Sequence, residues 1–363
     1  MKTDNDKITY RQLMKVAAVC MYLPILRLIP TENVAYWGNG AYIAALAAAL
    51  PSGLYIYFYS TFIKKRAPGQ GLGDLIIRCV GSVPGKIICA VFLLWFVLYA
   101  GFTLRMSSER LVTTIFDDSN LTFISLITIA AVLPAATGKI SSMCRTGEIF
   151  LLIIVGIMSI VLVMSLKGLK PEYFLPVENK GAWGFLRATT VVFDVITAIA
   201  YVGFLAGYAV KEKNELASTA KCGGSMLLFM AAITFCCVGA LSASLITEMQ
   251  NPFFVMVRNI SAFGVVERIE SVVVAVWVLA DFLFLSVLMR IVGVLAKTVT
   301  GLEIKNIFYY IVGVIVYLLS LAMGKDYFIL AEVSKNWIPA VNLFMTVVLL
   351  LAVFLIGKAR KKI

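Results

Sequence analysis

Two carboxylates lie within long apolar stretches of this chain, and their positions suggest a functional site. Asp281 is the only charged residue among the 19 from Ser271 to Met289. A helix that crosses a hydrocarbon core of about 30 Å needs about 20 mostly apolar residues. Because a carboxylate at the bilayer centre costs at least ~2.5 kcal/mol, we expect Asp281 to face protein or a water-filled cavity. Trp277 and Phe284, four residues before it and three after, share its helical face.

The second carboxylate, Asp194, belongs to a stripe of polar residues at helical spacing. Thr190, Asp194, Thr197 and Tyr201 follow one another at steps of four, three and four. On a helix of 3.6 residues per turn they form one face, which normally points into a bundle or a cavity. For both carboxylates two interpretations stay open. They line a binding cavity, or they make packing hydrogen bonds to a neighbouring span.

The composition excludes a soluble domain. Of 363 residues, 61% are hydrophobic and 14% are charged, and the mean hydropathy is +0.94. A typical soluble domain is about 25% charged, so we predict an all-α integral membrane protein. The chain has no histidine, which removes the commonest metal ligand and the usual general base. With no nucleotide-binding motif, metal-ligand cluster or nucleophile triad, we expect neither an enzyme nor a cofactor.

The positions of the basic residues and of the cysteines also indicate a membrane protein. The net charge of +12 is carried by short loops between apolar runs, which indicates membrane topology and not nucleic-acid binding. The seven cysteines show no C-x-x-C spacing and lie mostly within apolar runs, so we expect apolar packing and no disulfide framework. Pro24, Arg27 and Pro30 interrupt the first apolar run, which is therefore not expected to be a removable signal peptide.

We predict a single transmembrane domain, 1–363, of about ten spans. The spans lie near 10–30, 40–63, 86–108, 121–138, 147–166, 184–210, 222–246, 270–296, 306–323 and 337–357. Pro24 removes a backbone donor from the first span, and Arg27 follows closely. The first span is therefore expected to be broken where it lines a cavity. A simple proline kink is the alternative.

The loops predict the orientation. An even number of spans places both termini on one side of the membrane. If that side is the cytoplasm, the inner segments hold 20 of the 32 basic residues and the outer ones 11, with Arg290 inside a span. This bias favours cytoplasmic termini, although the basic 167–187 loop then lies outside. Arg105 and Glu109, one turn apart near the outer end of the third span, are expected to form a local ion pair.

Two amphipathic stretches occupy equivalent positions in the two halves of the chain. Residues 67–86 and 251–264 each precede the third span of a five-span half and carry apolar residues at helical spacing. One stretch lies on the predicted inside and the other on the outside. That layout is expected of two five-span repeats of opposite topology, at about 8–166 and 183–358.

Four stretches resemble one known family: ITYRQL, NGAYIAALAAALPSG, LRMSSER and ERIESVVVAVWVLADF. The sequence resembles the B subunit of GerA-type nutrient germinant receptors, a family of spore germination permeases similar to the amino acid–polyamine–organocation transporters. KPEYFLPVENKG before the sixth span is also similar to a run found in this family. The resemblance covers nearly the whole chain.

Two features depart from the family pattern. Where relatives usually have a glycine-rich break in the first span, this chain has Met21–Tyr22–Leu23–Pro24. Where relatives often carry proline, glycine and glutamate in the sixth span, this chain has Asp194 and no glycine or proline between Arg187 and Val202. We therefore expect unwinding of the sixth span to be confined to a few residues around Val192–Val195.

The resemblance implies a LeuT-like fold with a 5+5 inverted repeat, a broken first span and, in the family, a broken sixth span. It also implies a small-molecule site at the bilayer midplane between spans one, three, six and eight. The expected lining residues are Tyr22, Pro24, Tyr99, Thr103, Asp194, Thr197, Tyr201, Trp277 and Asp281.

The resemblance further implies a membrane subunit that binds a small nutrient germinant, an amino acid, and triggers spore germination. The implied partners are an A subunit with a large soluble portion and a lipoprotein C subunit, in the inner membrane of the spore. The alternative is an autonomous proton- or sodium-coupled amino acid transporter with Asp194 or Asp281 as the coupling group. A third possibility is a scaffold without a ligand.

Overall fold

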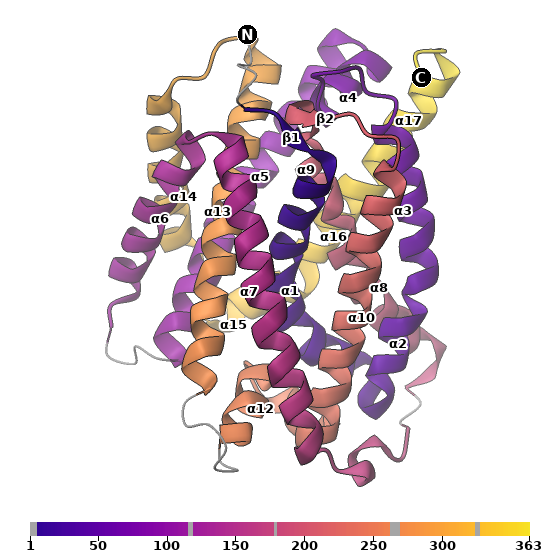
Figure 1. Ribbon diagram of the computed structural model, residues 1–363, viewed down its shortest axis with the longest axis vertical. Helices are drawn as coiled ribbons and strands as arrows, with labels where there is room; N and C mark the ends of the chain where they lie inside the picture. The colour runs from indigo at the N-terminus through magenta and orange to yellow at the C-terminus, as the bar shows by residue number, and fades with distance from the viewer. Residues whose placement is uncertain (1–5, 115–118, 178–179, 262–268, 324–326) are drawn as a thin grey trace.

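The protein is a bundle of long, roughly antiparallel helices (Figure 1). The structure, a computed structural model, describes residues 6–114, 119–177, 180–261, 269–323 and 327–363. Strand β1 (Ile8–Thr9), near the start of the chain, and the C-terminus lie at the same end of the bundle, which we call the terminal end (Figure 1). The family stretch ERIESVVVAVWVLADF begins within the undescribed residues, so its Glu267 and Arg268 lie outside the described part of the chain.

Helices occupy each of the ten predicted ranges, and the number that cross a bilayer stays a prediction. The first five ranges contain α1 (Tyr10–Trp37), α2 (Ala41–Ala47) with α3 (Ala49–Ile63), α5 (Ser82–Thr114), α6 (Leu121–Thr137) and α7 (Ile140–Ser165). The second five contain α8 (Gly181–Thr197) with α9 (Ile199–Gly203), α10 (Glu215–Leu241), α13 (Ile269–Thr300), α14 (Asn306–Ala322), and α16 (Ile338–Leu343) with α17 (Leu350–Ala359). Helix α15 (Tyr327–Glu332) precedes the tenth range. Two π-helical segments, η6 (Val333–Trp337) and η7 (Phe344–Leu349), flank α16.

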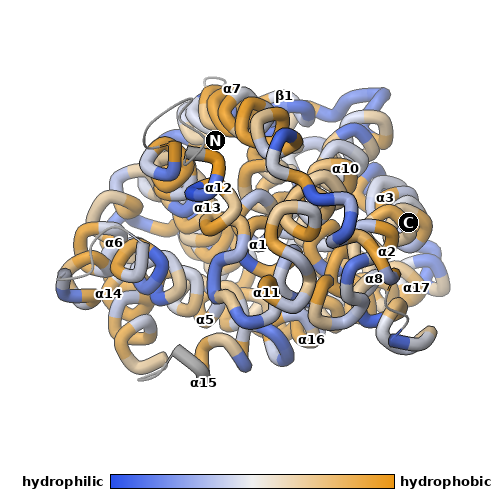
Figure 2. The backbone as a smooth tube through the Cα atoms, turned by 90° about the horizontal axis from the view of Figure 1, so that it is seen from below, coloured by the Kyte–Doolittle hydropathy of each residue, from blue (hydrophilic) through white to orange (hydrophobic). Residues whose placement is uncertain are grey.

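The outer surface of the bundle is apolar, as an integral membrane protein requires. Among the described residues, seven helical segments are long and apolar enough to cross a membrane, and α6 and α14 are shorter apolar helices. Leu50 and Leu152 are each 75% exposed, and Leu54 and Leu228 are also exposed. Apolar residues likewise dominate the outer helices in Figure 2. These side chains have no protein neighbours to cover them, so they face lipid.

Helix α1 runs through the centre of the bundle and corrects one expectation. It begins with a capping box, in which Thr9 Oγ1 accepts from Gln12 N and Gln12 Oε1 accepts from Thr9 N. It then continues as one helix of 28 residues through Pro24 and Pro30, so the break expected in the first span is absent. A proline removes a single backbone donor, and the close packing of α1 keeps the rest of the helix in place.

The sixth span is interrupted, but not where we expected. Residues around Val192–Val195 are helical, and α8 ends at Thr197 with a turn at Ala198. The Ala198 amide donates to Val195 O and the Tyr201 amide to Ala198 O, a tighter pattern than in an α-helix. The β-branched residues lower helix propensity by only tenths of a kcal/mol each, and their burial is enough to keep them helical.

The two predicted amphipathic helices are present at opposite ends of the bundle (Figure 1). Helix α4 (Leu72–Val80) lies at the terminal end and α12 (Pro252–Ser261) at the other, which we call the far end. Leu72, Leu75 and Ile76 are buried on α4, and Phe253 and Val257 are buried on α12. The inverted repeat itself stays a prediction, and this placement agrees with it.

Buried polar contacts close the terminal end. Strands β1 (Ile8–Thr9) and β2 (Ala209–Val210) pair in parallel and join the start of α1 to the segment after α9. Beside them Arg66 forms a bidentate ion pair with Glu215, at 2.6 and 2.8 Å. Their side chains are 2% and 0% exposed. The Arg66 guanidinium also lies over the ring of Tyr10, 5.5 Å from its centre.

Glu215→Gln is expected to lower the thermal unfolding midpoint of the purified protein strongly. Removing one partner of a buried ion pair leaves an uncompensated charge, at a cost of about 3–5 kcal/mol. Glu303→Gln is the matched control, because its pair with Lys297 is 57% and 87% exposed and such pairs contribute little. Equal midpoints for the two variants would contradict a locking role for the Arg66–Glu215 pair.

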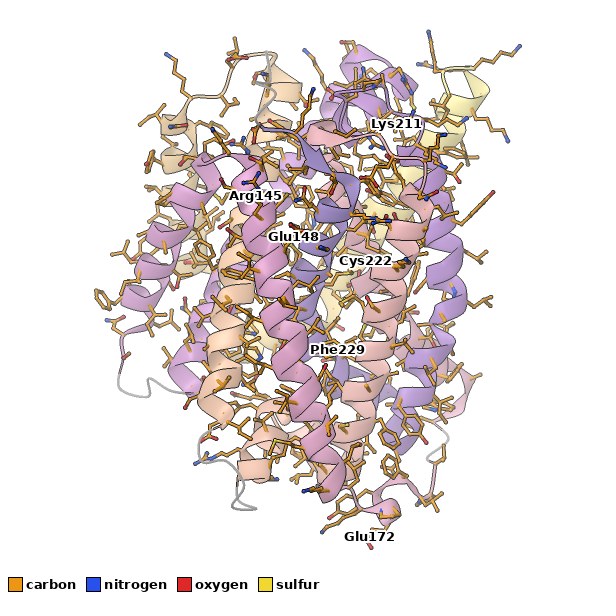
Figure 3. All side chains as sticks on the ribbon, in the orientation of Figure 1. Arg145, Glu148, Glu172, Lys211, Cys222 and Phe229 are labelled. Carbon is orange, nitrogen blue, oxygen red and sulfur yellow. The ribbon has the colours of Figure 1, made fainter. Side chains whose placement is uncertain are left out.

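The predicted orientation can be tested with single cysteines, since all seven native cysteines are buried. Lys362→Cys lies at the terminal end, and Glu172→Cys lies at the far end (Figure 3). In intact cells, a membrane-impermeant thiol reagent is expected to label Glu172→Cys and to leave Lys362→Cys unlabelled until the membrane is opened. The reverse pattern would invert the topology.

Candidate functional site

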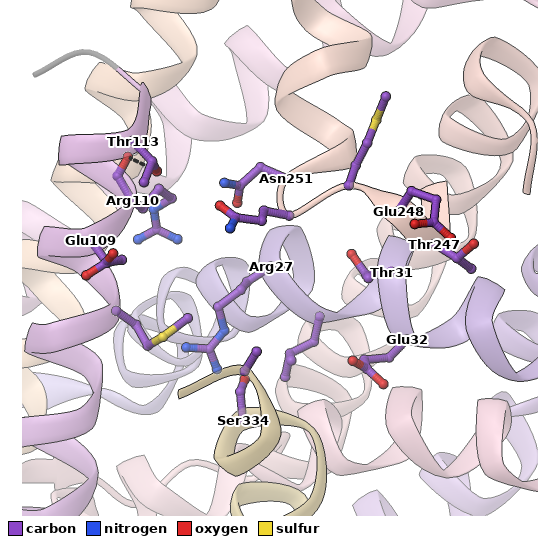
Figure 4. A pocket seen from close by; sticks show the side chains of 15 residues that line it. Arg27, Thr31, Glu32, Glu109, Arg110, Thr113, Thr247, Glu248, Asn251 and Ser334 are labelled. Carbon is purple, nitrogen blue, oxygen red and sulfur yellow. Dashed lines mark hydrogen bonds between the residues drawn. The ribbon is translucent and has the colours of Figure 1, made fainter. Parts of the chain in front are cut away.

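A polar cavity of about 230 Å³ lies at the far end of the bundle, among α1, α5, α15 and the segment before α12 (Figure 4). Its charged lining residues are of both signs: Arg27, Glu32, Glu109, Arg110 and Glu248. Thr31, Thr113, Thr247, Asn251 and Ser334 add uncharged polar groups. We call this the outer cavity. Its lining suits a small, polar, charged ligand better than an apolar one.

A narrow second cavity, which we call the deep cavity, lies next to the outer one, further into the bundle between α1, α5 and α13. Its volume is about 10 Å³, close to the least that a single water needs. Arg27, Met106 and Arg110 line both cavities. The remaining polar lining comes from Tyr99, Thr103, Ser107 and Asp281. The deep cavity thus continues the outer one toward the middle of the bundle.

A buried ion pair forms one wall of the deep cavity. Arg110 on α5 donates from a terminal guanidinium nitrogen to Asp281 on α13 at 2.6 Å. The two side chains are 8% and 4% exposed. The guanidinium also lies over the Trp277 ring, 5.1 Å from its centre, where a cation–π attraction adds to the pairing. Asp281 is thus compensated by a cation from a neighbouring span.

Several buried polar atoms around this pair have no protein hydrogen-bond partner. They are Tyr22 OH, Ser107 Oγ, Arg110 Nε and Trp277 Nε1. A buried donor left unpaired costs about 1–3 kcal/mol. Polar groups of a ligand, or water, could satisfy those that border the cavity. The unpaired atoms therefore support a polar occupant at this point of the bundle.

Further charges of both signs surround the outer cavity. Arg105 and Glu109 form the predicted local ion pair on α5, at 3.3 Å, with side chains 13% and 19% exposed. Glu32 on α1 pairs with Lys335 on η6 at 3.6 Å. Arg27 lies over the ring of Phe102, 5.2 Å from its centre. The cavity thus has cations on α1 and α5 close to carboxylates on the same helices.

A second polar cluster lies on the terminal side of the deep cavity, around Asn342 on α16. The Tyr201 hydroxyl donates to Asn342 Oδ1, and Asp194 and Tyr99 are close neighbours of the Asn342 side chain. The Tyr99 and Tyr201 rings are 6.1 Å apart and connect this cluster to the deep cavity. Asp194 Oδ1 is buried and has no partner.

Local helix irregularities shape this cluster. The Tyr55 hydroxyl lies 3.3 Å from both Thr197 O, at the end of α8, and Thr346 O, in the π-helical segment η7. Irregular turns leave such carbonyls available to side chains, and π-helical turns often occur at functional sites. The Thr197 hydroxyl donates to Asp194 O at 2.7 Å within its own helix.

Eight of the nine predicted site residues fall into two groups, and Tyr22 lies apart from both. Pro24, Tyr99, Thr103 and Asp281 line the deep cavity, with Trp277 packed on Arg110 beside it. Tyr22 stacks on Phe229 of α10, with ring centres 5.7 Å apart. The others, Asp194, Thr197 and Tyr201, belong to the cluster around Asn342. Thr190 bonds Leu186 O in its own helix and is not part of the cluster.

Three residues central to this geometry were not predicted as site residues: Arg27, Arg110 and Asn342. Only a partial signal for Arg110 was present, because a carboxylate inside a span needs a cation but Arg110 lies just past the predicted end of the third span. Choosing Arg110 over Arg27, Arg105 or Arg290 required the packing of α5 on α13. Within the described residues no group of three or more His, Cys, Asp or Glu side chains could hold a metal ion.

The arrangement of helices is similar to that of known membrane transporters. A Na⁺-coupled sialic acid symporter in a substrate-bound outward-open state superposes with a TM-score of 0.67 at 13% identity, covering 97% of this chain and 79% of its own. Mhp1, a nucleobase-cation-symport-1 family transporter with bromovinylhydantoin bound, superposes with a TM-score of 0.67 at 11% identity, covering 94% of this chain and 79% of its own. MhsT in complex with L-phenylalanine superposes with a TM-score of 0.69 at 14% identity, covering 95% of this chain and 87% of its own.

The fold is therefore that of the LeuT-like membrane transporters, as predicted. The chain belongs to the family described as "Spore germination protein", whose family model matches residues 19–327. This confirms the resemblance inferred from the sequence. No curated protein sequence matched the chain.

A double-mutant cycle on Arg110 and Asp281 tests the buried pair. Asp281→Asn alone leaves the guanidinium buried without a counter-charge and is expected to destabilise the protein by about 3–5 kcal/mol. Arg110→Met combined with Asp281→Asn removes both charges and is expected to destabilise by less than the two single changes together. Thermal unfolding of the four proteins gives the coupling, and strict additivity would contradict a direct interaction.

Proposed function

We propose that this chain is the membrane subunit of a spore germinant receptor, which binds a small nutrient germinant in the outer and deep cavities. The observation that carries the proposal is the charged lining of these cavities. Arg27 and Arg110 offer guanidinium groups, and Glu32, Glu109 and Glu248 offer carboxylates. An amino acid presents one carboxylate and one ammonium group, which such a lining matches in charge.

The likeness to MhsT in complex with L-phenylalanine supports an amino acid ligand, because a protein of this fold accommodates one. In our proposal the ligand carboxylate contacts Arg27 and the atoms of Arg110 that line the cavities. The ammonium group lies toward Glu32 and Glu109. The side chain reaches the deep cavity beside Tyr99 and Thr103, which widens as the ligand enters.

The closed terminal end favours a single access route. The basic residues favour cytoplasmic termini. In that orientation the outer cavity opens on the side of the membrane opposite the cytoplasm, and nutrients arrive from that side. The Arg66–Glu215 pair and the β1–β2 pairing hold the opposite end shut. Ligand binding can shift the balance between this state and another only by binding one of them more tightly. We propose that the A and C subunits respond to that shift, in the inner membrane of the spore.

An autonomous proton- or sodium-coupled amino acid transporter is the second candidate. One neighbouring fold is a Na⁺-coupled symporter, and the buried Asp194 with its unpaired oxygen is the group placed to couple a cation. Uptake of labelled amino acid by the purified chain in vesicles would favour the transporter. Copurification with A and C subunits, and ligand binding without uptake, would favour the receptor.

A screen for thermal stabilisation by single amino acids is the first experiment. A ligand at 100 times its dissociation constant stabilises the folded state by about 2.7 kcal/mol. We expect at least one amino acid to raise the unfolding midpoint, and amines without the carboxylate to have no effect. If no amino acid stabilises the protein and a sugar or nucleobase does, the amino acid assignment is wrong.

Arg27→Gln is expected to weaken binding of the stabilising amino acid by about tenfold or more. A hydrogen bond to a charged group contributes about 1.5–3 kcal/mol. Arg145→Gln is the control, since Arg145 is exposed on α7, away from the lining of both cavities (Figure 3). Titration by calorimetry measures both, and equal affinities in the two variants would exclude Arg27 as a ligand contact.

A further inference from the structure

A second groove of about 430 Å³ lies near the terminal end, between α1, α7 and α10. Figure 3 shows its position through Glu148 on α7 and Cys222 on α10, with α1 behind them. It shares no lining residue with the outer or the deep cavity. The function proposed above makes no use of this groove.

The groove is basic at its mouth. Arg11, Lys15 and Lys221 line it, and its described lining contains no carboxylate. The charge of Lys15 is balanced by Glu148, whose Oε1 lies 2.7 Å from Lys15 Nζ. Among the described residues neither Arg11 nor Lys221 has an ion-pair partner, and both are exposed.

The deeper part of the groove is mostly apolar and adjoins the lipid-facing surface. By their places along the helices, Ala18, Leu151 and Ser225 lie deeper than the basic residues, and Ser225 is the polar exception. On α7, next to Leu151, Ile149 is 59% exposed and Leu152 is 75% exposed. Arg11 and Lys15 fall within the first two turns of α1, within about 8 Å of its start at 1.5 Å per residue. The charges thus lie at the terminal end of the bundle, and the exposed apolar side chains of α7 lie deeper.

We propose that this groove is a binding site for an anionic phospholipid. The headgroup phosphate contacts Arg11 and Lys221, with hydrogen bonds from Ser218 and Asn214. One acyl chain runs along Leu151 and the exposed side chains of α7. Basic grooves between transmembrane helices are suited to acidic headgroups. A soluble anion would use the mouth alone and leave the apolar part of the groove uncovered.

In this proposal the lipid joins two helices that meet at the closed terminal end. Helix α1 follows β1, and α10 begins at Glu215, the partner of Arg66. A phosphate bound to Arg11 and Lys221 bridges α1 to α10 next to that ion pair. The bound lipid therefore stabilises the closed terminal end.

The test is thermal unfolding of the purified protein in detergent with added phosphatidylglycerol, phosphatidylcholine or inorganic phosphate. Arg11→Gln/Lys221→Gln is the test variant, because it keeps the Lys15–Glu148 pair. Lys361→Gln/Lys362→Gln removes the same charge from the exposed C-terminal tail at the same end. Native mass spectrometry counts the lipids that each protein retains.

Phosphatidylglycerol is expected to raise the midpoint of the wild-type protein and of the tail variant. For the same rise in midpoint, the test variant is expected to need a phosphatidylglycerol concentration roughly 25-fold higher. Each cation near an anionic headgroup contributes about a fivefold change in affinity, and the variant lacks two. Equal stabilisation by phosphatidylcholine, or by phosphate, would overturn the proposal. The proposal would also be overturned if the test variant folds without lipid and is stabilised by phosphatidylglycerol as much as the wild type is. The same holds if it retains as many phosphatidylglycerol molecules as the wild type.

Discussion

A charge inside a membrane protein needs a partner, and this constraint determines how the bundle is assembled. Arg110 and Asp281 are both nearly inaccessible, and each would be costly alone at the level of the hydrocarbon. Their contact fixes α5 against α13. Arg66 and Glu215 do the same for the end of α3 and the start of α10. Both pairs join a helix of the first half of the chain to a helix of the second half.

The two ion pairs lie in different surroundings, and only the Arg110–Asp281 pair borders the proposed ligand site. The Arg66–Glu215 pair lies at the closed terminal end, whereas the Arg110–Asp281 pair lies beside a cavity that opens at the far end. Helix α1 connects the two regions, with Tyr10 beside the first pair and Arg27 beside the second. A ligand that contacts Arg27 and Arg110 would therefore act on the central helix of the bundle, which is a suitable position for a receptor.

Much of the architecture could be predicted from the sequence because bilayer thickness and helical periodicity are strong constraints. They located the helices, the amphipathic α4 and α12, and the buried Asp194 and Asp281. The partner of Asp281 could not be predicted, since Arg110 is 171 residues away in the sequence. Its choice depends on helix rotation and packing.

The breaks were harder to predict for a related reason. Pro24 suggested an interruption, but a single missing donor does not end a helix that is packed on all sides. The interruption near Ala198 carries no proline or glycine. It coincides with the Tyr55 hydroxyl, which lies 3.3 Å from the Thr197 carbonyl. Such side-chain partners come from distant spans and leave no local signal.

In the proposed function, a small amino acid enters the outer cavity and reaches the deep one. Met106 lines both, so a cysteine at this position reports on the passage between them. The most direct measurement is the labelling rate of Met106→Cys by a membrane-impermeant thiol reagent, with and without the stabilising amino acid. The account predicts labelling from the side that bears the 167–187 loop, slowed strongly by the ligand. Labelling from the side of the termini, or a rate unchanged by saturating ligand, would contradict it.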